Sequence, residues 1–173
     1  MEEYLQLVRK AKRGDAEAFA ALYEEIYEKL YKFALYTLRN TADAEDVVSE
    51  TVTDAYGAIR RLRSEEAFHG WMFRILSNKC KNKLREYAKK TEPLPEELPE
   101  TSDEIGFAEK IQVRKLFFEL EDEERLIVGM HLFGGYKSRE IAEILKLNEN
   151  TVRSKESRAL KKLAGKLGEG GCH

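Results

Sequence analysis

A basic segment near the C-terminus, NTVRSKESRALKK (residues 150–162), carries side chains of the kind that bind nucleic acid. A helix turns 100° per residue, so Arg153, Ser157 and Arg158 are predicted to fall on one face. The opposite face carries an apolar stripe made of Val152, Ala159, Leu160, Leu163 and Leu167. Arginine and serine donate hydrogen bonds to phosphates and base edges, and a small serine lets a helix approach DNA closely. An ordinary solvated basic face is the alternative for this segment taken alone.

A second basic stretch extends from Arg60 to Lys90 and contains ten lysines and arginines but only three acids. On a helix, its polar stripe would contain Arg74, Asn78, Lys81 and Arg85, with Trp71 and Asn82 on the edge. Cations follow a phosphate backbone, aromatic rings stack on bases and amides bind base edges, so this stripe suits single-stranded DNA. For Trp71 and Phe68, a place in the core is the alternative.

An acidic stripe is predicted on another helix, with four residues at i, i+3, i+7 and i+11: Asp43, Asp46, Glu50 and Asp54. No lysine is interleaved among them, so their charges repel one another unless a basic partner covers them. The stripe is therefore predicted to bind a basic protein surface, with a solvated helix face as the alternative.

Neither catalytic nor metal chemistry is indicated by the sequence. The three histidines, His69, His131 and His173, are scattered, and no glycine-rich phosphate loop or nucleophile–base set occurs, so no enzyme, cofactor or metal site is predicted. Cys80 follows an apolar pattern and is predicted to be a buried thiol. No run of about 18 apolar residues exists and the N-terminus is unlike a signal peptide, so a cytoplasmic protein without membrane insertion is predicted.

These surfaces require helices to position them, and the periodicity predicts an all-α chain. Apolar residues spaced by three and four predict four helices within residues 1–90, of which the first stops at Gly14 and the second is capped by Asp15. The third is expected over about residues 43–62 and the fourth over about residues 65–87. No window alternates with period two, so no strand is predicted.

All three prolines lie in the acidic segment TEPLPEELPETSDE, which is predicted to be a flexible linker over residues 91–104. Residues 105–167 are predicted to form a second helical domain, in which Gly134-Gly135 ends one helix and Ser138 caps the next. That short helix, the turn LNEN and the basic helix have helix-turn-helix spacing. Residues 168–173, which include Cys172, are predicted to be a disordered tail.

Four sequence motifs occur along the chain, and their combination is more specific than any one of them. They are DAEDVVSET (43–51), FHGWMFRILSNKCKNKLRE (68–86), LEDEERLIVGMHLFGGYKSREIAEILKL (120–147) and NTVRSKESRALKKL (150–163). Together they make the chain resemble an extracytoplasmic-function (ECF) type sigma factor of the sigma-70 family, the initiation subunit of bacterial RNA polymerase. The resemblance covers most of residues 1–90 and 105–163.

The resemblance implies a role for each surface. The acidic stripe would bind the clamp of the largest subunit of core RNA polymerase, and the flap region and an anti-sigma factor are further implied partners. The helix around Trp71 and the loop before it would hold the −10 element of promoter DNA through Arg61, Arg63, Trp71, Arg74, Asn78, Lys81, Asn82 and Arg85. The helix-turn-helix would bind the −35 element through Lys137, Ser138, Arg139, Thr151, Arg153, Ser154, Lys155, Ser157, Arg158 and Lys161.

Glu156 departs from the family pattern, because it falls inside the apolar stripe where the family usually has an aliphatic residue. It is expected either to extend to solvent or to pair with a nearby base.

Two other functions compete with this interpretation. A stand-alone helix-turn-helix regulator would need neither the acidic stripe nor the second basic stretch. An interaction protein that sequesters another factor would not need two separate DNA-facing surfaces.

Overall fold

The computed structural model describes residues 1–90 and 114–170, with side chains as far as residue 165, and it contains helices but no strands in those ranges. The predicted all-α fold class is therefore confirmed. The predicted linker, residues 105–113 of the predicted second domain, and Cys172 with His173 lie outside the described residues. None of the described helices is long and apolar enough to cross a membrane.

The N-terminal part, residues 1–90, consists of α1 (Glu2–Lys12), α2 (Ala16–Leu38), α3 (Thr41–Ala58) and α4 (Phe68–Lys89). The Asp15 carboxylate accepts a hydrogen bond from the Ala18 amide (3.1 Å), which caps α2 as predicted. Asn40 caps α3 in the same way. Short 3₁₀ turns at Ile59–Arg61 and Glu65–Ala67 connect α3 to α4, so both helices are shorter at this connection than the periodicity predicts.

The C-terminal part, residues 114–170, begins with a helical turn at residues 114–118 and continues with α6 (Asp122–Gly134), α7 (Ser138–Leu145) and α8 (Glu149–Gly170). Gly135 ends α6 with a φ of 72°, a left-handed conformation that glycine adopts without steric cost. Helix α8 extends to Gly170, three residues into the segment predicted as a disordered tail.

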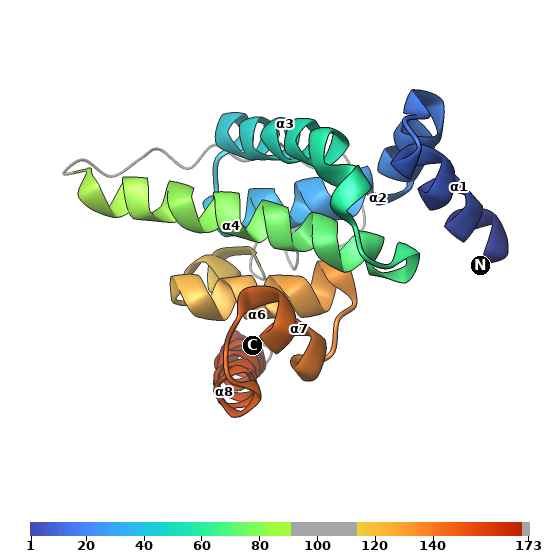
Figure 1. Cartoon of the computed structure of the whole chain (residues 1–173). Coiled ribbons are helices and arrows are strands. Elements are labelled where there is room, and N and C mark those ends of the chain that lie inside the picture. The colour runs from blue at the N-terminus through green and yellow to red at the C-terminus, as the bar shows by residue number, and fades with distance from the viewer. Residues whose placement is uncertain (91–113, 171–173) are drawn as a thin grey trace.

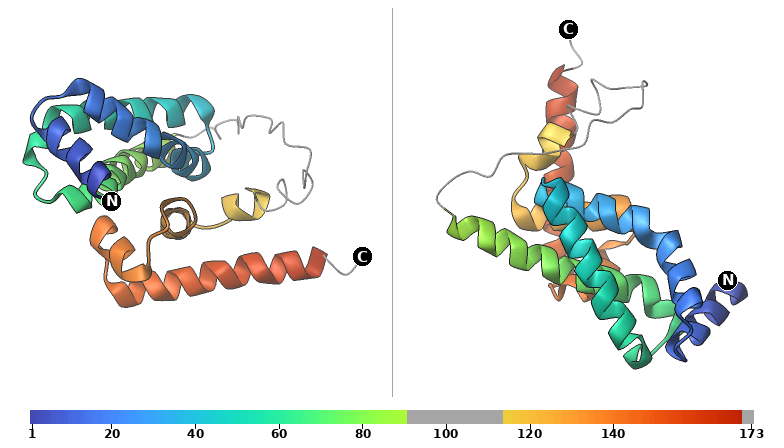
Figure 2. Two further views of the ribbon diagram at one scale, coloured as in Figure 1. Left: turned by 90° about the vertical axis from the view of Figure 1, so that its right-hand side faces the viewer. Right: turned by 90° about the horizontal axis from the view of Figure 1, so that it is seen from above.

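The two parts pack directly against each other, which the sequence did not predict. Figure 1 shows α2 and α4 lying above α6 and α7, and Figure 2 shows the same two layers from other sides. One hydrophobic core contains Phe33 and Met72 of the N-terminal part together with Ile127 and Met130 of the C-terminal part. Helix α8 lies on the far side of the C-terminal part, which leaves one of its faces open to solvent (Figure 2).

Candidate polymerase and nucleic-acid interfaces

The acidic stripe lies on α3 beside α4, and α4 supplies cations to part of it. Lys79 contacts Asp54 at 2.7 Å and Glu50 at 3.7 Å. Asp43 is only partly exposed, accepts a hydrogen bond from the Tyr87 hydroxyl and lies 3.8 Å from Lys83. Burial, together with this contact, raises the pKa of Tyr87 above its ordinary value. The stripe is thus partly neutralised within the chain, in contrast to the isolated cluster that the sequence suggests.

Asp46 and Glu50 are held less closely than Asp54, which Lys79 contacts at 2.7 Å. Both are exposed, and no ion pair to Asp46 within 4 Å occurs among residues 1–90 and 114–165. The Glu50 side chain is 64% exposed despite its contact with Lys79. An approaching basic surface would therefore meet these two carboxylates first.

The predicted −10 side chains on α4 divide into two groups. Asn78, Asn82 and Arg85 are exposed. Arg74, which is also exposed, and the half-buried Lys81 donate to main-chain oxygens of α7, with Arg74 Nη2 3.3 Å from the Glu143 oxygen and Lys81 Nζ 3.4 Å from the Leu145 oxygen. Burial lowers the pKa of Lys81 below its ordinary value. Sequence periodicity places all five on one polar stripe but cannot show that α7 covers one side of it.

The aromatic pair at the start of α4 is partly a core feature. Phe68 is fully buried, so the core alternative is correct for it. Trp71 is half-buried, with its ring centre 6.2 Å from that of Phe68, and it also lines a pocket. Trp71 can therefore pack against the core and contact a ligand in the pocket at the same time.

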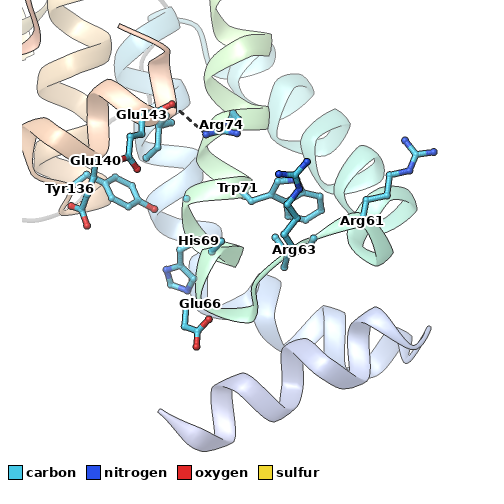
Figure 3. A pocket seen from close by; sticks show the side chains of 13 residues that line it. Arg61, Arg63, Glu66, His69, Trp71, Arg74, Tyr136, Glu140 and Glu143 are labelled. Carbon is cyan, nitrogen blue, oxygen red and sulfur yellow. Dashed lines mark hydrogen bonds between the residues drawn. The ribbon is translucent and has the colours of Figure 1, made fainter. Parts of the chain in front are cut away.

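A pocket of about 680 Å³ lies between the loop before α4 and the start of α7 (Figure 3). Arg61, Arg63 and Arg74 line one side of it, and Glu140 and Glu143 line the other. Arg61 and Arg63 are exposed, as a phosphate contact requires. Burial and the nearby Lys29 lower the pKa of His69, which also lines the pocket.

The helix-turn-helix forms as predicted from α7 and α8. Val152 is fully buried, Ala142 is 7% exposed, and Leu147 packs against the core, so the turn is fixed to the domain. The exposed face of α8 carries the predicted DNA contacts Arg153, Ser154, Ser157, Arg158 and Lys161, and Thr151 is half-buried beside them. Lys137 and Arg139, at the start of α7, are also exposed. The Arg153 guanidinium pairs with Glu149 at 2.7 Å but remains 65% exposed.

Three expectations about this helix-turn-helix need correction. Lys137, not Ser138, is the N-cap residue of α7, because the Glu140 carboxylate accepts from the Lys137 amide at 2.8 Å. Lys155 points towards α6 and pairs with Glu123 at 2.8 Å, so it lies at the side of the DNA-facing surface. Leu160, expected in the apolar stripe, is 41% exposed.

Glu156 is accommodated by partners from two other helices. Its side chain is only 12% exposed, and it accepts a hydrogen bond from the Ser138 hydroxyl at 2.7 Å. His131 Nδ1 lies 3.4 Å away on α6. Of the two expected outcomes, pairing is therefore correct, and the Ser138 hydroxyl serves Glu156 in place of a DNA phosphate. Three residues that are far apart in the sequence meet here, so no local pattern could have identified the contact.

A second buried carboxylate on α6 also depends on α8. Glu124 is 4% exposed, and Lys162 Nζ contacts it at 3.0 Å. The middle of α8 is therefore held to α6 by charge as well as by Ala159, which is fully buried.

The remaining titratable groups in the described ranges form no candidate metal site. Among the described residues, no group of three histidine, cysteine or acidic side chains could hold a metal ion. Cys80 is buried, as predicted, and burial raises the pKa of its thiol.

Two family models match this chain, and each corresponds to one of its parts. The model described as Sigma-70 region 2 matches residues 22–90, and the model described as Sigma-70, region 4 matches residues 110–163. A stand-alone helix-turn-helix regulator has no need of the first of these, so the pair of matches disfavours that alternative.

Similar proteins cover nearly the whole chain. The ECF RNA polymerase sigma factor SigM of Mycobacterium tuberculosis is 30% identical over 156 residues, which are 90% of this chain and 80% of the relative. The RNA polymerase sigma-H factor of Pseudomonas aeruginosa is 25% identical over 178 residues, which are 91% of this chain and 90% of the relative.

Two solved structures share the fold. CnrH, in complex with the cytosolic domain of CnrY, has a TM-score of 0.74 at 23% identity and covers 95% of this chain and 97% of its own. The sigma factor RpoE, in complex with the anti-sigma factor NepR from Bartonella quintana, has a TM-score of 0.74 at 22% identity and covers 88% of this chain and 98% of its own. Both likenesses support the all-helical architecture described above.

Proposed function

This chain belongs to the ECF-type sigma factors of the sigma-70 family, and we propose how its surfaces share the recognition of a promoter. It is an alternative sigma factor, an initiation subunit that directs RNA polymerase to promoter DNA, and it is not an enzyme. The assignments to particular residues below rest on exposure, charge and position in the two matched parts.

The acidic stripe on α3 binds the clamp of the largest polymerase subunit. The observation that carries this assignment is the exposure of Asp46 and Glu50 on a face whose other acids are held by Lys79 and Lys83. Complementary charge increases the rate of association and disfavours wrong partners. Helix α3 is packed firmly into the core, because Ala44, Val48 and other apolar residues of this helix are buried.

Helix α4 and the loop before it hold the displaced strand of the −10 element. Arg61 and Arg63 suit phosphate contacts, and Trp71 offers a ring edge in the pocket between them and α7. Asn78, Asn82 and Arg85 extend this surface along α4, where amides suit base edges and the cation suits phosphate.

Helix α8 enters the major groove at the −35 element. Arg153 and Arg158 are the first choices for base or phosphate contacts, because both are exposed and arginine bonds guanine in a bidentate manner. The serines between them leave room for close approach. Lys137 and Arg139 contribute backbone contacts from the start of α7.

The partners are core RNA polymerase, through the clamp and the flap region, and an anti-sigma factor that keeps the chain inactive. The related fold of RpoE, which was solved with an anti-sigma factor, supports the second partner. Since its polymerase and promoter partners are cytoplasmic, this sigma factor acts in the cytoplasm.

A pull-down of core RNA polymerase tests the polymerase assignment. The double change Asp46→Arg with Glu50→Arg should abolish retention of polymerase by a folded chain, because it places two cations where the partner surface is basic. The matched control is Glu24→Arg with Glu28→Arg, which changes the charge equally on exposed positions of α2. Unchanged retention by the Asp46 and Glu50 variant would refute the assignment.

Run-off transcription on a promoter library tests the DNA assignments. Wild-type chain with core polymerase should yield transcripts from promoters that share one two-element sequence. Binding to polymerase without such transcripts would contradict promoter recognition by α4 and α8.

A further inference from the structure

A groove of about 490 Å³ lies on the proposed DNA-facing side of the helix-turn-helix, between the start of α7 and the exposed edge of α8. Figure 1 shows α7 lying beside α8. The polar side chains that line the groove are Ser138, Arg153, Glu156, Ser157 and Lys161. Three of them, Arg153, Ser157 and Lys161, are spaced by four residues and so follow one ridge of α8. Apart from Glu156, the polar lining therefore consists of cations and hydroxyl groups.

Without Glu156, this lining would suit a phosphate of the DNA backbone. Arginine, lysine and serine are among the side chains that bind phosphates in protein–DNA complexes. In a helix-turn-helix, the first helix crosses the backbone while the second enters the major groove. The backbone of the bound duplex would therefore pass where α8 meets the start of α7, next to the exposed Lys137 and Arg139. The inference that follows rests on the proposed function of α8 as the −35 helix.

Glu156 places a negative charge in this groove. Its side chain is 12% exposed, accepts a hydrogen bond from the Ser138 hydroxyl at 2.7 Å and lies 3.4 Å from His131 Nδ1. The carboxylate could turn away to solvent only by giving up the bond from Ser138. A carboxylate and a phosphate are both anions and both accept hydrogen bonds, so they repel each other. Salt screens this repulsion less at a partly buried position than at an exposed one.

Glu156 also removes a phosphate donor from the start of α7. A serine hydroxyl has one proton to donate, and Ser138 donates it to the Glu156 carboxylate. A phosphate in the groove would need that same proton. Through one residue the groove thus gains a negative charge and loses a hydroxyl donor, so both changes oppose the binding of phosphate there.

We propose that Glu156 keeps one DNA phosphate out of the groove between α7 and α8, and that it thereby weakens the sequence-independent part of −35 binding. Phosphate contacts carry no sequence information, so the base contacts of Arg153 and Arg158 supply a larger share of the binding free energy. Glu156 acts by repulsion and by holding Ser138. It is therefore a specificity-determining residue that contacts no base itself.

Two substitutions at Glu156 separate its charge from its hydrogen bond. Glu156→Gln removes the charge and keeps an oxygen that can accept from the Ser138 hydroxyl. Glu156→Leu removes both the charge and the acceptor, which frees that hydroxyl. The matched control is Glu143→Gln, which removes the same charge from an exposed position of α7 outside the groove. Circular dichroism verifies that each variant is folded, and the conservative glutamine variant keeps the test decisive if the leucine variant is not.

Fluorescence anisotropy with the purified full chain measures the effect on DNA affinity. The probes are a mixed-sequence duplex of about 20 base pairs and a −35 duplex taken from the transcribed promoters. At about 0.1 M salt, both Glu156 variants should bind either duplex about five- to tenfold more tightly, the gain expected from the release of one more counterion. The decrease of log K with log salt should become steeper by about one phosphate. Glu143→Gln should leave affinity and salt dependence near the wild-type values.

Ser138→Ala distinguishes phosphate exclusion from a merely structural effect of Glu156. In the wild-type chain, Ser138→Ala should leave DNA affinity unchanged, because the hydroxyl is bound to Glu156. In the Glu156→Leu chain it should reduce the gain, because the freed hydroxyl then binds phosphate. Wild-type affinity in both Glu156 variants, or a gain in Glu156→Leu that Ser138→Ala leaves intact, would overturn the inference.

Arg158→Ala separates failure of this inference from failure of the proposed function. If Arg158→Ala weakens binding to the −35 duplex while the Glu156 variants bind like the wild type, only the role of Glu156 is wrong. If Arg158→Ala leaves −35 binding unchanged, the assignment of α8 to the −35 element is wrong, and the role of Glu156 with it.

Discussion

The two basic helices, α4 and α8, have similar side chains but different surroundings. Arg153, Ser157 and Arg158 of α8 are exposed on the outer side of the C-terminal part. Arg74 and Lys81 of α4 are bonded to the end of α7. Composition therefore gives both helices side chains that suit DNA, whereas only on α4 do two of these side chains bond to the other part of the molecule.

Other cations of both helices form ion pairs within the protein. Lys155 and Lys162 of α8 pair with Glu123 and Glu124 of α6, which holds the helix in its domain. On α4, Lys79 pairs with the acidic stripe of α3. Each helix thus divides its cations between a structural side and a proposed DNA side.

The largest effect is expected from Arg158→Ala on the accessible helix. Loss of one good base contact costs about 1–3 kcal/mol, so affinity for a −35 duplex should decrease about 5- to 150-fold while polymerase retention is unchanged. Lys155→Ala, at the paired side, should reduce affinity less. Fluorescence anisotropy at fixed salt measures both, and equal effects would remove the distinction between the two sides of α8.

Next in size is the stability cost of Lys162→Ala. Removing this cation leaves the buried Glu124 carboxylate without its partner, which should lower the free energy of unfolding by about 1–3 kcal/mol. Lys161→Ala, at an exposed position of the proposed DNA face, should change stability by less than about 0.5 kcal/mol. It should instead reduce the salt dependence of −35 binding by about one phosphate. Chemical denaturation measures the stability of both variants, and a salt titration measures their −35 binding. A larger loss of stability for Lys161→Ala than for Lys162→Ala would contradict this assignment.

A smaller effect is expected at Glu156. Glu156→Ala removes the acceptor of the Ser138 hydroxyl and should cost about 1 kcal/mol of stability. Glu156→Gln keeps an acceptor and should cost less. Thermal unfolding compares the two variants, and an equal loss for both would mean that the charge beside His131, not the bond from Ser138, holds the helices together.

The smallest expected effect is a pH dependence of the free energy of unfolding, which should arise from His69 on α4. Burial, with a contribution from Lys29, lowers the pKa of His69 in the folded chain. The unfolded chain therefore binds this proton more readily, so stability should fall as the pH decreases through about 6.5. Denaturation midpoints at about pH 7.5 and pH 5.5 should show this fall, and His69→Gln should reduce it. A larger reduction by His131→Gln would place the sensitive group on the α8 side.

Much of the local structure follows from neighbours along the chain, which is why the sequence predicted it. Asp15 caps α2 through an amide three residues away, and Gly135 ends α6 with its own left-handed backbone. The exposed face of α8 follows from its 3.6-residue period. The family resemblance rests on the same local motifs. The end of α3 was misplaced because the chain tightens into a 3₁₀ turn, a change of hydrogen bonding that apolar spacing does not reveal.

The sequence by itself determined the helices, their charged and apolar faces and the family, because these depend on residues within a few turns of one another. Only the tertiary structure decided that Glu156 meets Ser138, that Lys155 turns towards Glu123, and that Arg74 meets the end of α7 across 69 residues of chain. Such contacts depend on how whole helices pack, and packing is set by the shape and volume of many side chains together. The same residue types are therefore exposed on one helix and form contacts between the two parts on another.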